Sequence, residues 1–202
     1  LSERNTLLTA LANLSDETTY LNNNRQQSSS SYDEVVLAPF QKALDDKTPR
    51  KLIILHLIGT HFAYQYRYPE SYDFFKDDKV PTAIPLNSDE IDIYNQYDNA
   101  VRYNDHVVRR IIDTYKATDP YGFLMYFSDH GEEVYDSRKM DGRSMSEPTP
   151  NMYDVPFIIW PSPRWASNYN VEALKSTVNR PASQRDFLNG WCDLARIQYK
   201  EC

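Results

Sequence analysis

The sequence contains no apolar run long enough for a membrane helix. Such a helix needs about 20 consecutive apolar residues, and no segment of the 202-residue chain approaches that length. Nothing at its start resembles a signal peptide. An excess of positive charge is also missing: the formal net charge of -7 argues against a general nucleic-acid binder, because such proteins neutralise phosphates with Lys and Arg.

Cysteine is scarce, and the two cysteines, Cys192 and Cys202, lie close together near the end of the sequence. Their spacing fits a small disulfide loop in an oxidising compartment and equally fits two unpaired thiols. The sequence has no internal repeat and no linker long enough to divide it. With 41% hydrophobic and 13% aromatic residues, it is able to bury a core. We therefore expect residues 1–202 to form one soluble, globular domain.

An apolar run at residues 121–127 ends abruptly in the polar residues 128–132. Such a run is typical of a buried strand in a parallel sheet, and ligands of these sheets bind at the carboxyl ends of the strands. Asp129 offers an oxygen and His130 a nitrogen, a pairing suited to zinc, and Gly131 allows the backbone to turn sharply. The alternative is a polar turn without a ligand, because short motifs often mislead.

A second apolar run, residues 51–62, contains two histidines. Because side chains alternate between faces along a strand, His56 lies within the predicted strand, whereas His61 follows Gly59 in the loop beyond it. We interpret His56 as a hydrogen-bonded core histidine and His61 as the functional one. Parallel topology gathers such loops on one edge of a sheet, so His61 is expected to share a site with Asp129 and His130.

Three charged residues near these strand ends are further candidates for the site. Arg67 is able to grip a phosphate with two donors, although an exposed arginine among tyrosines is as often a surface stack. Glu132 either orients His130 by accepting its ring proton or faces solvent. Arg143 lies in a polar segment, residues 133–151, that is too long for a simple connection. Arg67 and Arg143 are our candidates for contacting anionic groups of a substrate.

Helical patterns alternate with the predicted strands. A long helix is expected from about Ser88, with one apolar stripe of core residues: Ile91, Tyr94, Tyr97, Val101, Val108, Ile111 and Tyr115. Another buried strand is expected at residues 154–160, and a last helix begins near Ser183. Strands separated by helices predict an α/β fold with a mostly parallel central sheet and helices on both faces.

Five segments occur in an order that is more specific than any one of them: residues 56–62, 66–69, 97–101, 127–132 and 155–160. Together they resemble the catalytic domain of bacterial phosphoethanolamine transferases, which are inner-membrane enzymes of the alkaline phosphatase and sulfatase superfamily. The chain is most similar to the lipopolysaccharide-core type, because residues 132–137 follow the metal motif and Arg143 follows Gly142 in the next loop. Members that modify lipid A typically have a further histidine there.

The resemblance implies transfer of phosphoethanolamine from phosphatidylethanolamine to lipopolysaccharide, at a core sugar, its phosphate or lipid A. In this family a zinc-activated threonine attacks the phosphorus, diacylglycerol leaves, and an acceptor then takes the phosphoethanolamine group. By residue match, Asp129 and His130 are zinc ligands and His61 is the histidine on the substrate side. The resemblance also implies a catalytic domain that faces the periplasm and is anchored in the inner membrane by other residues.

The resemblance exposes a gap at the start of the sequence. The family's first strand, which carries a further acidic metal ligand, and its threonine nucleophile both precede the part that residues 1–5 resemble. We therefore expect an N-terminally truncated catalytic domain with no nucleophile in this chain. Alone, the chain is expected to be inactive and to hold zinc weakly or not at all, because Asp129 and His130 supply only part of a tetrahedral site.

Two other functions stay open. A sulfatase or phosphodiesterase of the same superfamily would hydrolyse its substrate, and access of an acceptor to the site decides between hydrolysis and transfer. A metal-free remnant with a structural or binding role is the third hypothesis. Residues 66–69 and the predicted helix that carries Tyr97 favour the transferase, which is the leading hypothesis.

Overall fold

The structure is a computed structural model that describes residues 7–21 and 31–198. Packing divides the chain into two compact units, residues 1–118 with 125–158 and residues 119–124 with 159–202. The prediction that residues 1–202 form one catalytic domain stays a prediction. Residues 1–5 and Cys202, on which two further predictions depend, lie outside the described residues.

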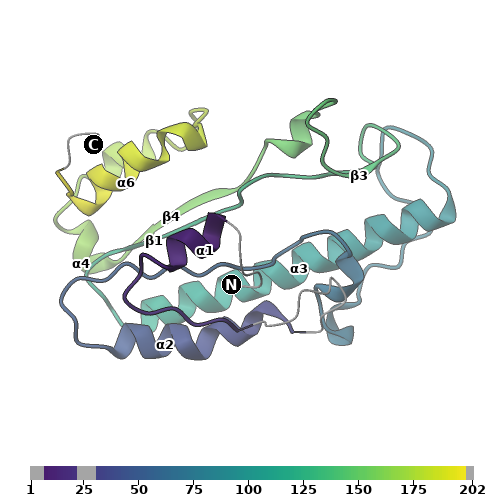
Figure 1. Ribbon diagram of the computed structural model, residues 1–202. Helices are drawn as coiled ribbons and strands as arrows, with labels where there is room; N and C mark the ends of the chain where they lie inside the picture. The colour runs from purple at the N-terminus through teal and green to yellow at the C-terminus, as the bar shows by residue number, and fades with distance from the viewer. Residues whose placement is uncertain (1–6, 22–30, 199–202) are drawn as a thin grey trace. The chain divides into compact units, whose positions relative to one another are not determined.

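The first unit contains most of the helical structure (Figure 1). Its α-helices are α1 (Leu7–Ala12), α2 (Leu37–Asp45) and α3 (Ser88–Ala117). Its short 3-10 helices are η1 (Asp33–Val36), η2 (Tyr64–Tyr66), η3 (Glu70–Tyr72) and η4 (Pro150–Met152). An antiparallel pair of short strands, β2 (Glu133–Val134) and β3 (Asp141–Gly142), completes it.

Two strands, β1 (Phe123–Phe127) and β4 (Phe157–Pro161), pass between the units and pair in a two-stranded sheet. Both agree with strands expected from the sequence. The expectation that they are fully buried is wrong, because Phe157 is 46% exposed and no residue of β1 is completely buried. A two-stranded sheet is buried only if other residues pack on both of its faces. The described residues pack on these faces only in part.

The second unit is built on aromatic packing. Its helices are α4 (Pro163–Ala166), α5 (Val171–Lys175), η5 (Gln184–Asp186) and α6 (Phe187–Ala195). The ring of Phe123 lies edge-on to Trp165 at 5.6 Å and to Trp191 at 5.2 Å between centroids. The helix predicted near Ser183 is confirmed, since the Ser183 side chain accepts a hydrogen bond from the Arg185 backbone. Cys192 is buried and disulfide-bonded.

The long helix α3 forms the framework of the first unit. It begins with a capping box in which Asn87 and Glu90 satisfy each other's backbone N–H groups, which explains why the helix starts near Ser88 as predicted. The predicted apolar stripe is partly wrong, because Val101 is 43% exposed. The buried residues of α3 are Asn95, Asn99, Ala100, Tyr103, Val107, Val108, Ile111 and Tyr115.

The buried amides of α3 explain this shift of its covered face. Asn99, which is 1% exposed, accepts hydrogen bonds from the backbone N–H groups of Phe74 and Phe75 and donates one to the Phe75 carbonyl. Asn95 holds Asp77 in the same way, through one donated and one accepted hydrogen bond. An extended segment thus covers the polar side of the helix, because the two asparagines satisfy its backbone groups.

Helix α2 lies alongside α3 (Figure 1), and its residue Phe40 is buried, as is Val36 at the end of η1. Tyr32, just before η1, packs edge-on against Tyr103 of α3 with 5.8 Å between ring centroids. Glu34 of η1 accepts a hydrogen bond from Arg110 of α3 at 3.3 Å. The start of η1 is therefore fixed to the framework helix by both apolar and charged contacts.

The strand predicted within residues 51–62 is not formed. Leu52 is 63% exposed and Ile54 is 70% exposed, and no strand in the described part of the chain pairs with this segment. A strand depends on hydrogen bonds to a neighbour, so an apolar run without one stays irregular. The prediction that His56 is a core histidine is also wrong, because its side chain is exposed.

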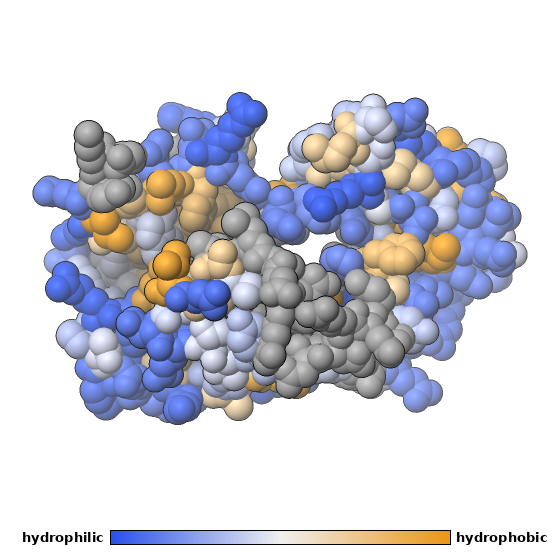
Figure 2. All heavy atoms as spheres, viewed as in Figure 1, coloured by the Kyte–Doolittle hydropathy of each residue, from blue (hydrophilic) through white to orange (hydrophobic). Residues whose placement is uncertain are grey.

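Among the described helices, even α3 with its 30 residues is too polar to cross a lipid bilayer, and none of the others qualifies. Figure 2 shows hydrophilic side chains over most of the viewed face, with smaller hydrophobic groups between them.

Candidate metal and catalytic site

The end of β1 places Asp129 and His130 side by side. Asp129 is 88% exposed, and its Oδ2 atom lies 3.8 Å from Nε2 of His130, which is 22% exposed. The other ring nitrogen of His130, Nδ1, lies 2.9 Å from the Gly131 carbonyl oxygen. A carbonyl only accepts hydrogen bonds, so Nδ1 carries a proton, and in the neutral ring the lone pair is on Nε2. This tautomer fits a metal ligand whose second nitrogen is held by the protein.

Gly131 brings the metal motif against η4. Its backbone N–H donates to the Met152 carbonyl at 3.0 Å. A Cβ atom at this position would lie 2.0 Å from the Asn151 carbonyl oxygen, which is far inside the contact distance. Only glycine therefore permits this approach. The glycine that the sequence predicted as a turn former serves mainly to let two backbone segments touch.

We expect Gly131→Ala to destabilise the protein by about 3 kcal/mol, because the added methyl group meets backbone atoms that cannot move aside. Urea unfolding of the full-length protein measures the change. Gly190→Ala in α6 is the control, since an added Cβ there meets nothing within 4 Å. The control should be more stable by about 0.5–1 kcal/mol, as expected for glycine replaced within a helix. Equal stability of Gly131→Ala and wild type would refute the contact.

Glu132 lies near both predicted functional histidines, His61 and His130. Its Oε2 atom accepts a hydrogen bond of 2.5 Å from the hydroxyl of Tyr64, which is 2% exposed. Burial raises the pKa of the Glu132 carboxyl, while the Tyr64 hydrogen bond and the nearby charges of His130 and His61 act to lower it. The structure thus brings His61 and His130 close to one carboxylate.

The sequence left two roles open for Glu132, which were to orient His130 or to face solvent. The structure shows neither of them directly. The carboxylate is half-buried, and its hydrogen bond comes from Tyr64, whereas Nδ1 of His130 contacts the Gly131 carbonyl. Orientation of His130 by Glu132 stays a prediction. Tyr64 was missed by the sequence reasoning, and its position between the His61 loop and Arg67 is the only signal that pointed to it.

Arg67 is buried, with 7% of its surface exposed, so the surface-stack interpretation is wrong. Its Nε donates to the His61 carbonyl at 3.0 Å and its Nη2 to the Phe62 carbonyl at 3.1 Å. These contacts favour a role in holding the His61 loop over the foreseen contact with substrate, which stays a prediction.

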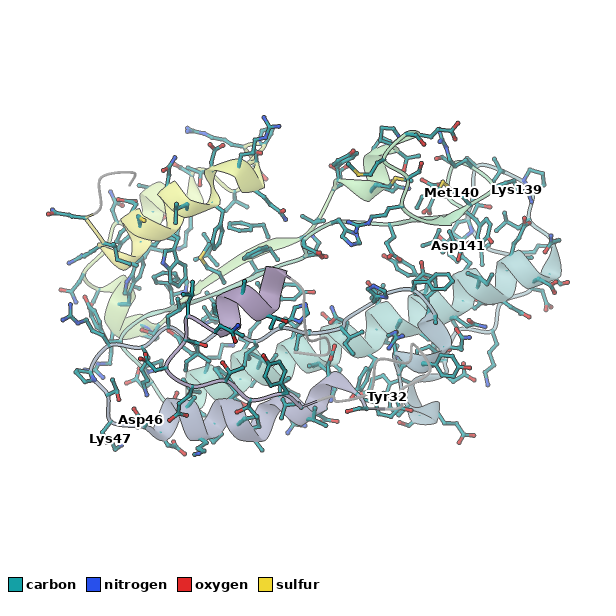
Figure 3. All side chains as sticks on the ribbon, viewed as in Figure 1. Tyr32, Asp46, Lys47, Lys139, Met140 and Asp141 are labelled. Carbon is teal, nitrogen blue, oxygen red and sulfur yellow. The ribbon has the colours of Figure 1, made fainter. Side chains whose placement is uncertain are left out.

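Arg143 is exposed directly after β3. The antiparallel register pairs Glu133 with Gly142 and Val134 with Asp141. Arg143 therefore follows Gly142 along the side of the hairpin that leads back to Glu132. Figure 3 shows Lys139, Met140 and Asp141 at this hairpin near the first turns of α3. There Lys139 pairs with Glu90 of α3, so the hairpin is fixed to the framework helix.

Glu133 is completely buried and organises the segment after it. Its Oε1 atom accepts hydrogen bonds from the backbone N–H of Ser137 at 2.6 Å, from the Ser137 hydroxyl at 3.0 Å and from the Arg138 N–H at 3.3 Å. Its Oε2 atom accepts one from the Asn151 amide at 3.4 Å. Burial alone would raise the pKa of this carboxyl, but the hydrogen bonds outweigh it and hold the pKa below the usual value of 4.5.

We expect Glu133→Gln to lose about 1.5–3 kcal/mol of stability at pH 7, because hydrogen bonds to a charged acceptor are replaced by weaker ones. The folded pKa lies below the unfolded one, so the contribution is complete above pH 4.5 and is lost as the pH falls through the folded pKa. Unfolding by urea at pH 7 and pH 3.5 tests this.

The exposed Glu147, which pairs with Arg138 in the same segment, supplies the control Glu147→Gln. The stability difference between wild type and Glu133→Gln should shrink at pH 3.5, while the control stays close to wild type at both pH values. A difference that is equal at both pH values would show that the Glu133 charge contributes nothing.

No group of three or more metal-ligating side chains occurs among the described residues. Asp129 and His130 offer one oxygen and one nitrogen whose separation allows a single ion to reach both. The donor chemistry therefore fits zinc, and two protein ligands leave coordination positions for other groups.

The comparisons with known proteins define the class to which this site belongs. A family model described as sulfatase matches residues 2–197. The chain belongs to the sulfatase family.

Within that family the chain is similar to named phosphoethanolamine transferases. It is 46% identical to phosphoethanolamine transferase EptC of Escherichia coli O18:K1:H7, a match that covers 98% of this chain and 35% of the relative. It is 47% identical to phosphoethanolamine transferase CptA of Salmonella typhimurium, again over 98% of this chain and 35% of the relative. The chain thus spans about a third of the length of the curated relatives it matches.

A solved structure extends the comparison to three dimensions. The C-terminal periplasmic domain of EptC from Escherichia coli, crystallised as a complex with zinc, superposes with a TM-score of 0.91 at 45% identity. The match covers 98% of this chain and 56% of that one. The predicted alkaline phosphatase and sulfatase-like α/β fold is confirmed, and so is the predicted resemblance to phosphoethanolamine transferases.

Proposed function

We propose that this chain forms part of the periplasmic catalytic domain of a phosphoethanolamine transferase that modifies lipopolysaccharide. The observation that carries the proposal is the match to EptC, at 46% identity over 98% of the chain. That match includes the end of β1, where Asp129 and His130 converge. The donor is phosphatidylethanolamine, and the enzyme is anchored in the bacterial inner membrane by residues other than those described.

Asp129 and His130 hold zinc in this proposal. The neutral Nε2 of His130 and the exposed Asp129 carboxylate are the ligating groups, and the Gly131 carbonyl keeps the histidine in the required tautomer. When bound, zinc supplies Lewis-acid chemistry that lowers the pKa of a nucleophile and stabilises charge on phosphoryl oxygens. Among the described residues no group of three or more potential metal ligands occurs, so two protein ligands leave coordination positions for other groups.

His61 and Arg143 act on the substrate. His61 is exposed in its loop and lies near the Glu132 carboxylate, so its ring is able to donate hydrogen bonds or a proton to the phosphoryl group or the departing oxygen. Arg143 is exposed on the hairpin that leads back to Glu132 and contacts anionic groups of the acceptor. Glu132, held by Tyr64, is the acidic neighbour of His61 in this site.

The acceptor class follows from the relatives. A Kdo(2)-lipid A phosphoethanolamine 7''-transferase of Escherichia coli is 31% identical over 59% of this chain, and the higher identity is to EptC and CptA. A lipopolysaccharide core sugar or its phosphate is therefore our preferred acceptor, with lipid A as the second.

Hydrolysis is the competing function, and the match to a sulfatase family model is the observation that favours it. The two functions differ in their products. A transferase moves the phosphoethanolamine group to lipopolysaccharide, whereas a sulfatase-like phosphodiesterase releases free phosphoethanolamine into water. After incubation with phosphatidylethanolamine, mass spectrometry of the lipopolysaccharide and of the aqueous phase distinguishes the two functions.

We expect His130→Ala to lower transfer by the full-length protein by more than about 100-fold, because a zinc ligand is lost. Turnover of a fluorescent phosphatidylethanolamine analogue measures this, and thermal unfolding checks that the fold is kept. His106→Ala is the control, since His106 packs on Tyr103 of α3 and has no predicted role. Wild-type transfer by His130→Ala would remove His130 from the site.

A further inference from the structure

We propose that Asp33 and Arg67 are positioning residues for His61, because they hold the two sides of the loop that carries it. The loop runs from Ile58 to Ala63. The proposal rests on the proposed function in one respect: it gives His61 a part in the transfer. The geometry of the loop itself does not depend on that function.

Asp33 holds the first half of the loop through both carboxylate oxygens. Its Oδ1 atom accepts a hydrogen bond from the Ile58 N–H at 3.0 Å, and its Oδ2 atom accepts one from the Gly59 N–H at 2.7 Å. Asp33 is the first residue of η1, which packs against α2 and α3. A carboxylate 25 residues away in sequence thus ties the loop to the framework helix.

Arg67 holds the second half. Its Nε and Nη2 atoms donate to the carbonyl oxygens of His61 and Phe62, at 3.0 and 3.1 Å. The planar guanidinium fixes the direction of both hydrogen bonds, which a lysine cannot do with a single nitrogen. One of the two accepting groups is the carbonyl of His61 itself. The main chain of the predicted catalytic histidine is therefore directly held.

The loop needs such support because its backbone is strained. Gly59 has a φ of 59° and Ala63 has a φ of 65°, so left-handed residues lie on both sides of His61. Glycine adopts this conformation readily, but alanine does so at a cost, and it persists only where neighbouring contacts enforce it. Asp33 and Arg67 supply those contacts at opposite ends of the same loop.

The two residues also offset each other's burial. Burial raises the pKa of the Asp33 carboxyl, and the positive charge of Arg67 is among the influences that lower it. Burial lowers the pKa of the Arg67 guanidinium, and Asp33 raises it. The opposite charges on the two sides of the loop therefore reduce part of the cost of burying Arg67 and half-burying Asp33. We call this pair the loop clamp.

The loop clamp explains how the exposed His61 side chain is held in a defined position. The His61 ring is free to meet a substrate, whereas its backbone is fixed at its own carbonyl and at Ile58, Gly59 and Phe62. A displacement of a catalytic group by about 1 Å can lower a rate by about 100-fold. Loosening the clamp should therefore lower turnover without weakening substrate binding.

The first test measures the clamp without reference to activity. Asp33→Asn and Arg67→Lys are compared with Asp113→Asn and Arg109→Lys, which alter an exposed ion pair of 2.7 Å on α3. In the full-length protein, amide exchange at Ile58 and Gly59 should be faster by about 10-fold or more in Asp33→Asn and unchanged in both controls. Unchanged exchange in Asp33→Asn would overturn the clamp.

The second test asks whether the clamp acts through His61. Asp33→Asn and Arg67→Lys should each lower kcat by about 10- to 100-fold and change KM by less than about twofold. In a His61→Ala background each should lower the remaining kcat by less than about threefold, because the group they position is gone. An equal loss in both backgrounds would overturn the positioning role. If Asp33→Asn does not fold, Arg67→Lys, which keeps the charge, decides alone.

The two tests separate the inference from the proposed function. Fast exchange in Asp33→Asn together with wild-type kcat in His61→Ala would refute the role of His61 in the transfer and leave the clamp standing. If amide exchange in Asp33→Asn is as slow as in wild type while His61→Ala loses most of its kcat, the proposed function stands and the clamp is refuted.

Discussion

The site depends on the contact between Gly131 and η4. At this point the backbone after β1 lies so close to the Asn151 carbonyl that no side chain fits between them, and a hydrogen bond to the Met152 carbonyl fixes the approach. On one side of Gly131 the turn presents His130, whose tautomer is set by the Gly131 carbonyl. On the other side it presents Glu132. A single glycine thus places the proposed metal ligand and the neighbouring carboxylate at a fixed spacing.

Three carboxylates around this site are held in three different ways. Glu132 accepts from a buried tyrosine hydroxyl, Glu133 accepts from the backbone and side chain of Ser137, and Asp33 accepts from two backbone N–H groups of the His61 loop. None relies on an exposed ion pair, whose contribution to stability is small. The loops around the site are therefore ordered by hydrogen bonds to one buried and two half-buried carboxylates, and hydrogen bonds to charged groups are among the stronger polar interactions in proteins.

The sequence predicted those features that depend on neighbours along the chain. The strand that ends before Asp129 and His130 was found because an apolar run stops at polar residues, and α3 was found because helical spacing is local. Features that depend on distant residues were not found. Residues 51–57 have the composition of a strand but lack a pairing neighbour among the described residues, and nothing near Arg67 in sequence shows that it is buried. Asp33 reaches its loop across 25 residues, a contact without a sequence pattern.

We propose that the end of β1 is the zinc site of a phosphoethanolamine transferase. Anomalous X-ray diffraction at the zinc absorption edge, from crystals of the full-length protein grown with zinc, tests it most directly. The account predicts a peak about 2.0–2.2 Å from Nε2 of His130 and from a carboxylate oxygen of Asp129. A zinc peak bound by other residues, with Asp129 and His130 both out of contact, would contradict it.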